Sequence, residues 1–322
     1  MTDPTLHTDG RVADATDANW VDRYAPAATR PYLRLSRADR PAGTWLLLLP
    51  CWWGLALAVA TTGGWTPYTV WLAIACALGA FLMRGAGCTW NDLTDQDFDA
   101  QVARTRSRPL PSGQVTAGQA RAWMIVQALA AFAILLTFPH AAILLGVLSL
   151  ALVAVYPFAK RFTWWPQVFL GLAFNWGALL LWVAVTGSLS PAPIALYAAG
   201  IAWTLFYDTI YAHQDKEDDA LIGVRSTARL FGERTPRWLL LFLVSTVTLA
   251  ALAVILALIS GPQVPLLVAL AGVWGMGLHL NWQMRRLDID DPLVCMHLFR
   301  SNRDAGLILS VMLALAAWLA AA

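Results

Sequence analysis

The residues most able to do chemistry in this chain are carboxylates gathered in two short stretches. The first stretch reads NDLTDQDFD, from Asn91 to Asp99. At about 100° per residue, Asn91, Asp95 and Asp99 drift by only about 40° per step and form a stripe on one helix face. Asp92 flanks that stripe. The spacing therefore predicts a cluster of oxygen ligands at one end of a helix.

The second stretch contains Asp208, Asp215 and Asp219, which are separated by seven and then four residues. On one continuous helix these three carboxylates would stay within about 40° of one another. We expect them to form a second acidic face, with the role of Asp208 left open.

Both stretches offer oxygen ligands only, because neither stripe includes a His or a Cys. Carboxylates with an Asn amide favour a hard cation such as Mg2+ over zinc. Two acidic faces at the same membrane depth would also repel each other unless a cation neutralised them. The alternative is that each cluster is a solvated helix end. The presence of two clusters beside basic loops favours the metal interpretation.

Basic residues near the clusters could bind a phosphate group. Arg108 and Lys160 flank two short segments that contain proline, RPLPSG and YPFAKR, where a fixed loop could aim a cation at a diphosphate. Tyr156 would lie one turn before Lys160 if the helix continues past Pro157. For other cations we prefer simple membrane topology as the explanation: Arg34, Arg37, Arg121, Arg285 and Arg286.

Arg84 precedes Asn91 by seven residues inside an otherwise apolar segment. An arginine within a membrane is costly and usually functional. Seven residues place it on nearly the same helix face as Asn91 and roughly 10 Å deeper, a suitable position for binding the far end of a small anionic acceptor. The alternative is an arginine that reaches the interface or is paired internally.

The elements that must position these residues are membrane helices. The chain has 322 residues, of which 58% are hydrophobic and 13% charged, against the roughly 25% charged of an ordinary soluble domain. A helix needs about 20 apolar residues to cross a bilayer. We therefore predict an all-α, polytopic membrane bundle of about nine transmembrane helices. The predicted spans are 44–61, 68–90, 118–137, 141–157, 165–186, 194–212, 236–259, 264–283 and 304–321.

Charge divides the connections into two sets. The connections TTGGWTP, TFPHA, TGSLSPAP and SGPQVP contain no Lys, Arg, Asp or Glu, so the charged residues belong to the other side. The positive-inside rule places that side, with the N-terminus and the candidate site, in the cytoplasm. Residues 1–40 are predicted to form a mobile polar cytosolic tail and residues 41–322 the transmembrane domain.

Three segments resemble signature segments of 4-hydroxybenzoate polyprenyltransferases in the UbiA superfamily of membrane prenyltransferases. They are GCTWNDLTDQDFDAQVARTRSRPLPSG, YPFAKRFTWWPQVFLG and YDTIYAHQDKEDDALIGVRSTARLFG. The similarity extends from about Leu33 to the C-terminus. It implies helices around a central cavity that opens laterally to membrane lipid, and a place in ubiquinone biosynthesis in a bacterial inner membrane.

The resemblance also implies roles for residues. The two motifs would bind Mg2+ through Asn91, Asp92, Asp95, Asp99, Asp215 and Asp219, with Asp95 and Asp215 essential for catalysis. The diphosphate of a polyprenyl diphosphate would contact Arg108, Tyr156, Lys160 and Arg161. Arg84 would face the carboxylate of the acceptor, 4-hydroxybenzoate, and no nucleic-acid partner is expected.

Three alternatives stay open on the sequence alone. A cation transporter would also carry carboxylates in the membrane, but it would not need Arg108, Lys160 and Arg161 around them. A scaffold without catalytic activity would tolerate loss of Asp95. A related prenyltransferase acting on homogentisate, dihydroxynaphthoate or haem would keep both motifs and differ around Arg84, and this alternative ranks second.

Overall fold

The structure is a computed structural model. It describes residues 10–13, 15, 16, 18–101, 105–221 and 223–321, without the side chains of 97, 98, 218 and 219. The described residues form helices, turns and bends and contain no strand. The predicted all-α class is therefore confirmed.

Nine long helices in the described chain correspond to the nine predicted spans. Eight of them are long and apolar enough to cross a membrane. The ninth, α10, has 22 residues and packs against α9, α13 and α15. The long helices are α3 (Ala42–Thr61), α4 (Pro67–Thr94), α6 (Ala117–Leu135), α7 (His140–Val155), α9 (Pro166–Thr186), α10 (Pro191–Ala212), α13 (Thr235–Leu258), α14 (Gln263–Arg286) and α15 (Pro292–Leu319).

Short helical segments connect or precede the long helices. They are α1 (Trp20–Tyr24), α2 (Arg30–Leu35), α5 (Gln96–Asp99), η2 (Tyr156–Phe158), α8 (Ala159–Phe162), η3 (His213–Asp215), α11 (Lys216–Leu221), α12 (Thr227–Phe231) and η4 (Gly232–Arg234), where η marks a 3-10 helix.

Helix α15 begins twelve residues earlier than the predicted span 304–321. The polar stretch Arg300–Asp304 interrupts the apolar run inside this helix, so the largely apolar turns before it, Leu293–Phe299, were not joined to the predicted span. Asp291 caps this end by accepting the backbone N–H groups of Leu293 and Val294 at 2.8 and 3.2 Å, and Pro292 occupies the first turn. Capping residues, not apolarity, set where this helix starts.

The chain divides into two compact units, one formed by the described residues of 1–44 and 78–135 and the other by those of 45–77 and 136–322. In the first unit, Leu35, Leu110, Val115 and Ala120 form a buried apolar cluster. Helices α4 and α6 approach closely at Gly85, where an added Cβ would lie 1.9 Å from Gln127 Oε1. The prediction of a mobile tail over residues 1–40 stays a prediction, although α1 and α2 fold within this unit.

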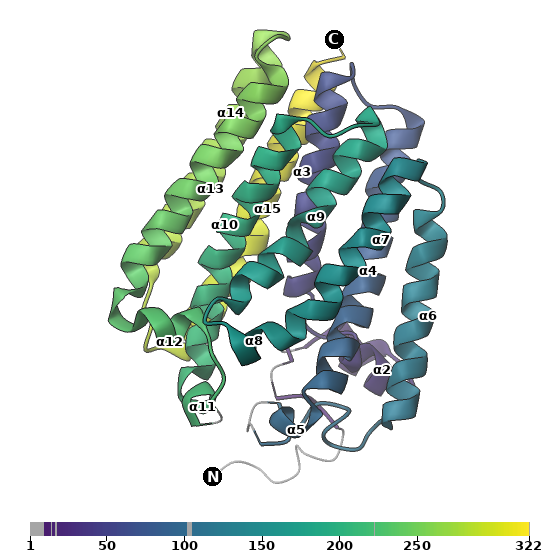
Figure 1. Ribbon diagram of the computed structural model, residues 1–322, viewed down its shortest axis with the longest axis vertical. Helices are drawn as coiled ribbons and strands as arrows, with labels where there is room; N and C mark the ends of the chain where they lie inside the picture. Colours follow the sequence, from purple (N-terminus) through teal and green to yellow (C-terminus); the bar gives the residue numbers. More distant parts are fainter. Residues whose placement is uncertain (1–9, 14, 17, 102–104, 222, 322) are drawn as a thin grey trace. The chain divides into compact units, whose positions relative to one another are not determined.

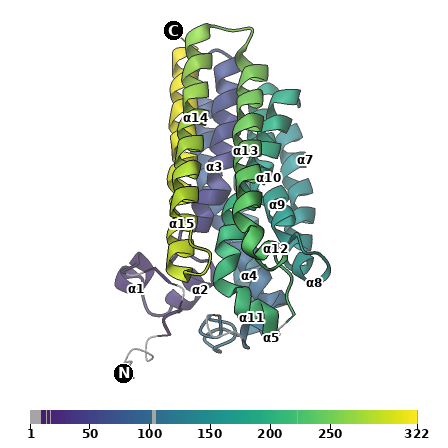
Figure 2. The same ribbon diagram turned by 90° about the vertical axis from the view of Figure 1, so that its left-hand side faces the viewer.

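The second unit holds most of the long helices. Helix α10 packs against α9, α13 and α15, and α14 packs between α13 and α15 (Figures 1 and 2). Its core contains the fully buried Trp53 and Trp203, with ring centroids 4.9 Å apart. The indole N–H groups are satisfied by Gly306 O at 3.0 Å and Asn302 Oδ1 at 2.9 Å, respectively, as buried polar groups require.

Candidate active site

The first carboxylate cluster lies at the end of α4 and in the short helix α5. Asp95 occupies a bend between them. Its N–H donates to Asn91 O at 3.0 Å, and the Asp99 N–H donates to Asp95 O at 2.8 Å. Both bonds span four residues, so the backbone keeps α-helical spacing through the bend. The predicted stripe of Asn91, Asp95 and Asp99 is thus present in the backbone.

Arginines neutralise two carboxylates of this cluster. Arg108 Nη1 lies 2.9 Å from Asp99 Oδ2 and 3.4 Å from Asp92 Oδ1. Arg37 Nη2 lies 2.5 Å from the same oxygen of Asp92. All four side chains are buried. The structure therefore brings together Asp92, Asp99 and Arg108, as expected for one site, and adds Arg37, which we had attributed to membrane topology.

Burial dominates the electrostatics of Asp99. Removal from water raises the pKa of its carboxyl group, and the nearby carboxylates of Asp92 and Asp95 raise it further. The Arg108 and Arg37 guanidinium groups lower it, but by less. Burial, and not a surplus of negative neighbours, therefore disfavours the Asp99 carboxylate, and a bound cation would offset that cost.

The first cluster fits Mg2+ by the chemistry of its donors. Asp92 and Asp95 have no exposed surface, and within the described structure Asp92 Oδ2 has no hydrogen-bond partner. A buried carboxylate oxygen without a donor is costly unless a cation binds it. Among the described residues, no three His, Cys, Asp or Glu side chains already form a group that could hold a metal ion. Arg108 Nη1 contacts Asp92 and Asp99, two of the carboxylates that a metal-binding group would need here.

Arg84 lies on α4, which runs unbroken from Pro67 to Thr94, as its predicted relation to Asn91 requires. The side chain is half-buried. Its guanidinium packs on Gly43 at the start of α3, where an added Cβ would lie 2.5 to 2.7 Å from Nη2, Cζ and Nε. The similar distances to three atoms indicate that the flat face of the guanidinium lies on the glycine.

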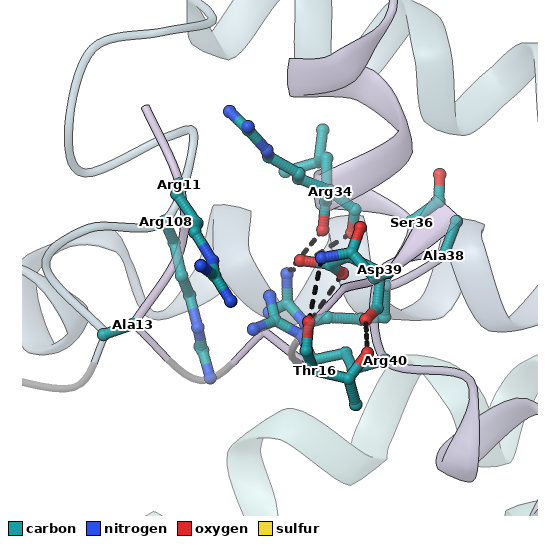
Figure 3. A network of polar contacts seen from close by, with 12 residues as sticks. Arg11, Ala13, Thr16, Arg34, Ser36, Ala38, Asp39, Arg40 and Arg108 are labelled. Carbon is teal, nitrogen blue, oxygen red and sulfur yellow. Dashed lines mark hydrogen bonds and ion pairs between the residues drawn. The ribbon is translucent and has the colours of Figure 1, made fainter. Parts of the chain in front are cut away.

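Asp39 lies in the turn at residues 36–40, between α2 and α3, and the sequence alone assigned it no role. Thr16 donates to Asp39 O through both its N–H, at 3.3 Å, and its hydroxyl, at 2.5 Å (Figure 3). The Asp39 carboxylate has no exposed surface, and burial raises its pKa to about 6. Arg40 Nε lies 3.6 Å from its Oδ1, and the Arg37 charge opposes the effect of burial on the pKa of Asp39. Only the density of charged residues in RLSRADRPAG could have signalled this turn.

The second carboxylate cluster follows α10 in the second unit. Asp208 lies within α10 and Asp215 ends η3, and both side chains are half-buried. The chain stays helical between them but passes from α10 into the 3-10 turn η3, which turns by about 120° per residue against about 100° in an α-helix. Asp208 and Asp215 therefore do not share one continuous α-helix, and their common acidic face stays a prediction. The side chain of Asp219 lies outside the described residues.

The predicted diphosphate ligands of the second unit lie at the end of α7. The chain stays helical past Pro157, through η2 and α8, as the pairing of Tyr156 with Lys160 required. Both side chains are half-buried, whereas Arg161 is exposed and its guanidinium lies 5.2 Å from the Phe158 ring centre. The segment after the second cluster is tied here, because Arg225 N–H donates to Lys160 O at 3.3 Å.

Comparison with known proteins decides the family. Residues 47–303 match the UbiA prenyltransferase family. This chain belongs to the UbiA prenyltransferase family. Similar curated relatives include the mitochondrial 4-hydroxybenzoate polyprenyltransferases of Bos taurus, Homo sapiens and Arabidopsis thaliana, which are 49%, 47% and 45% identical. The matches cover 90%, 93% and 91% of this chain and 76%, 78% and 70% of those proteins.

Solved structures of UbiA homologues share the fold. The homologue from Archaeoglobus fulgidus bound to GPP and Mg2+ is 22% identical, with a TM-score of 0.67 over 90% of this chain and 99% of that one. The homologue from Aeropyrum pernix K1 in its apo form is also 22% identical, with a TM-score of 0.66 over 84% of this chain and 96% of the other.

The relatives also correct one prediction. Placement in a bacterial inner membrane is wrong by this comparison, because these relatives are mitochondrial enzymes of animals and plants. The eight apolar helices still support an integral membrane protein of the UbiA family. The charge pattern distinguishes the two sides of a membrane but contains nothing that distinguishes one membrane from another.

Proposed function

We propose that this chain transfers a polyprenyl group from polyprenyl diphosphate to position 3 of 4-hydroxybenzoate, with release of diphosphate, in ubiquinone biosynthesis. The similarity to enzymes of that name, at 45 to 49% identity over nine-tenths of the chain, supports the reaction. The observation that carries the site is the buried group of Asp92, Asp99 and Arg108. Membrane lipid surrounds the bundle and admits the long apolar donor.

The residues of the chain have separate tasks in this reaction. The carboxylates of the stretch Asn91–Asp99 would hold Mg2+, and Asp215 and Asp219 are predicted to supply metal ligands as well. Bound Mg2+ would neutralise the diphosphate and make it a better leaving group. Arg108, Tyr156, Lys160 and Arg161 would donate hydrogen bonds to diphosphate oxygens, and charge-assisted bonds of this type are the strong ones.

Bond making and breaking follow from these positions. The C–O bond between the allylic carbon and the diphosphate breaks, and the electron pair leaves with the diphosphate. The ring carbon next to the phenol carbon of 4-hydroxybenzoate bonds to the allylic carbon. The proton of that ring carbon passes to an aspartate carboxylate or to the released diphosphate, and the C–H electron pair restores aromaticity. Arg84 would hold the carboxylate of the acceptor and so present position 3 to the donor.

A membrane assay tests this function. Membranes containing the protein are incubated with a polyprenyl diphosphate and radiolabelled 4-hydroxybenzoate, with Mg2+ or with EDTA. We expect a lipid-soluble labelled product that requires Mg2+. Product from homogentisate, dihydroxynaphthoate or haem but not from 4-hydroxybenzoate would move the assignment to a related acceptor. If no acceptor gave product with a verified donor, the assignment as a prenyltransferase would be contradicted.

A further inference from the structure

Arg37 is buried beside the first carboxylate cluster and does not behave as a topological surface charge. Its side chain is only 8% exposed, and Nη2 donates to Asp92 Oδ1 at 2.5 Å. Nη1 donates to the backbone carbonyl oxygens of Arg34 and Leu35 at 3.4 Å. A cation that only set the membrane orientation would stay in water, because burying it costs free energy unless a partner compensates.

The backbone at Arg37 strengthens this point. Its φ is 59°, in the left-handed region, just after the end of α2 at Leu35. Glycine is the usual residue where a helix ends in this conformation, because a Cβ is disfavoured there. The turn has other bonds besides the two long ones from Arg37 Nη1: the N–H of Arg37 donates to Arg34 O at 3.0 Å, and the indole N–H of Trp20 donates to Ala38 O at 3.0 Å. An arginine at a position suited to glycine indicates a task for its side chain.

The two oxygens of Asp92 have different surroundings. Oδ1 accepts from both Arg37 and Arg108, whereas Oδ2 is buried and has no hydrogen-bond partner in the described part of the chain. Arg108 lies nearer to Asp99, at 2.9 Å, than to Asp92, at 3.4 Å. Arg37 therefore makes the shorter of the two contacts that fix the Asp92 carboxylate.

We propose that Arg37 is a positioning residue for the first carboxylate cluster, holding Asp92 by Oδ1 so that Oδ2 is presented to the divalent cation. Carboxylates that bind metals are generally oriented by hydrogen bonds to their other oxygen. The proposal rests on binding of Mg2+ by this cluster. It assigns to Arg37 no contact with substrate.

A direct metal-binding measurement tests the proposal without relying on activity. Purified full-length protein in detergent is titrated with Mn2+, and free Mn2+ is followed by electron paramagnetic resonance. Arg37→Gln should weaken Mn2+ binding about 10- to 100-fold, as loss of an orienting partner does. Arg37→Lys keeps the charge and should recover part of the affinity. Arg121→Gln removes an exposed arginine of α6 and should leave the affinity unchanged.

A second set of variants separates positioning from folding. Arg37→Gln removes one of the two cations that compensate the buried negative charge of Asp92, and this loss destabilises the folded protein. Asp92→Asn and the double variant Asp92→Asn with Arg37→Gln contain no uncompensated Asp92 charge. If Arg37 acts through Asp92, adding Arg37→Gln to the Asp92→Asn variant should change its Mn2+ affinity by less than about threefold. If the two residues act independently, the losses in binding free energy should add.

Four results would overturn the proposal. Unchanged Mn2+ affinity in folded Arg37→Gln would remove the positioning role. Tighter binding would show that Arg37 competes with the cation. A further tenfold loss in the Asp92→Asn background would show that Arg37 acts independently of that carboxylate. No saturable Mn2+ binding by the unsubstituted protein would remove the premise, while the prenyl-transfer assay would still report on the function separately.

Discussion

The guanidinium of Arg84 lies flat against Gly43, although 41 positions separate them in the chain. An added Cβ on Gly43 would come within 2.5 Å of Nη2 and 2.7 Å of Cζ and Nε. Contacts below 3.0 Å are not tolerated, so a larger residue would displace the end of the Arg84 side chain. Gly43 thereby fixes where the charge of Arg84 lies along α4.

Gly43→Ala should raise the KM for 4-hydroxybenzoate about tenfold, which corresponds to about 1.4 kcal/mol of lost binding. The shifted guanidinium would no longer meet the carboxylate of the acceptor, whereas the donor would bind as before. Steady-state kinetics with each substrate varied in turn would measure both constants. Gly79→Ala is the matched control, because Gly79 lies on α4, the helix that carries Arg84, and an added Cβ there meets nothing within 4 Å. An equal rise in the KM for the donor would remove Gly43 from acceptor positioning.

Asp95→Asn and Asp215→Asn should each reduce turnover by about 100-fold or more, since each removes the charge of a ligand from the proposed Mg2+ site. The amide is isosteric, so the amount of protein in the membrane and its thermal unfolding should change little. Asp288→Asn, which alters an exposed carboxylate, controls for nonspecific effects. Full activity in either test variant would contradict the requirement for both motifs.

Lys160→Ala should weaken donor binding more than Arg161→Ala. Lys160 is half-buried in α8, and its carbonyl group is held by Arg225, whereas Arg161 is exposed and packs on Phe158. A fixed, partly desolvated cation binds a phosphate more strongly than a solvated one. The KM for polyprenyl diphosphate would be compared between the two variants. An equal rise in this KM in both variants would show that burial does not decide how strongly each cation binds the donor.

Asp39 should make stability depend on pH. Burial raises the pKa of its folded-state carboxyl to about 6, against about 3.9 in an unfolded chain. The folded protein therefore holds the proton more tightly between about pH 4 and pH 6, and the free energy of unfolding falls as pH rises through that window. A shift of about two pKa units sets an upper limit of about 3 kcal/mol.

Asp39→Asn removes the charge that burial disfavours. At pH 7 the variant should unfold at a higher temperature than the original protein, and the difference should shrink toward pH 4. Thermal unfolding in detergent across this range measures it, with the exposed Glu233→Gln as control. A constant difference between the two proteins over the whole range would contradict titration of Asp39.

Local patterns were sufficient for much of the fold and for part of the site. The spacing of Asn91, Asp95 and Asp99 predicted the stripe that the four-residue backbone hydrogen bonds show. Apolar length predicted the nine long helices, most within three residues at each end. It failed for the start of α15, because the charged stretch Arg300–Asp304 interrupts the apolar run while the helix itself continues.

Sequence alone determined the membrane-embedded helical class, the two carboxylate motifs and the oxygen-only chemistry that suits Mg2+, because each depends on residue type and on short spacings along a helix. Tertiary structure decided which arginines are buried against the first motif and which glycine Arg84 packs on. Arg37 meets Asp92 across 55 positions. Such a contact depends on how a turn places one side chain against a distant helix, and no local periodicity encodes that placement.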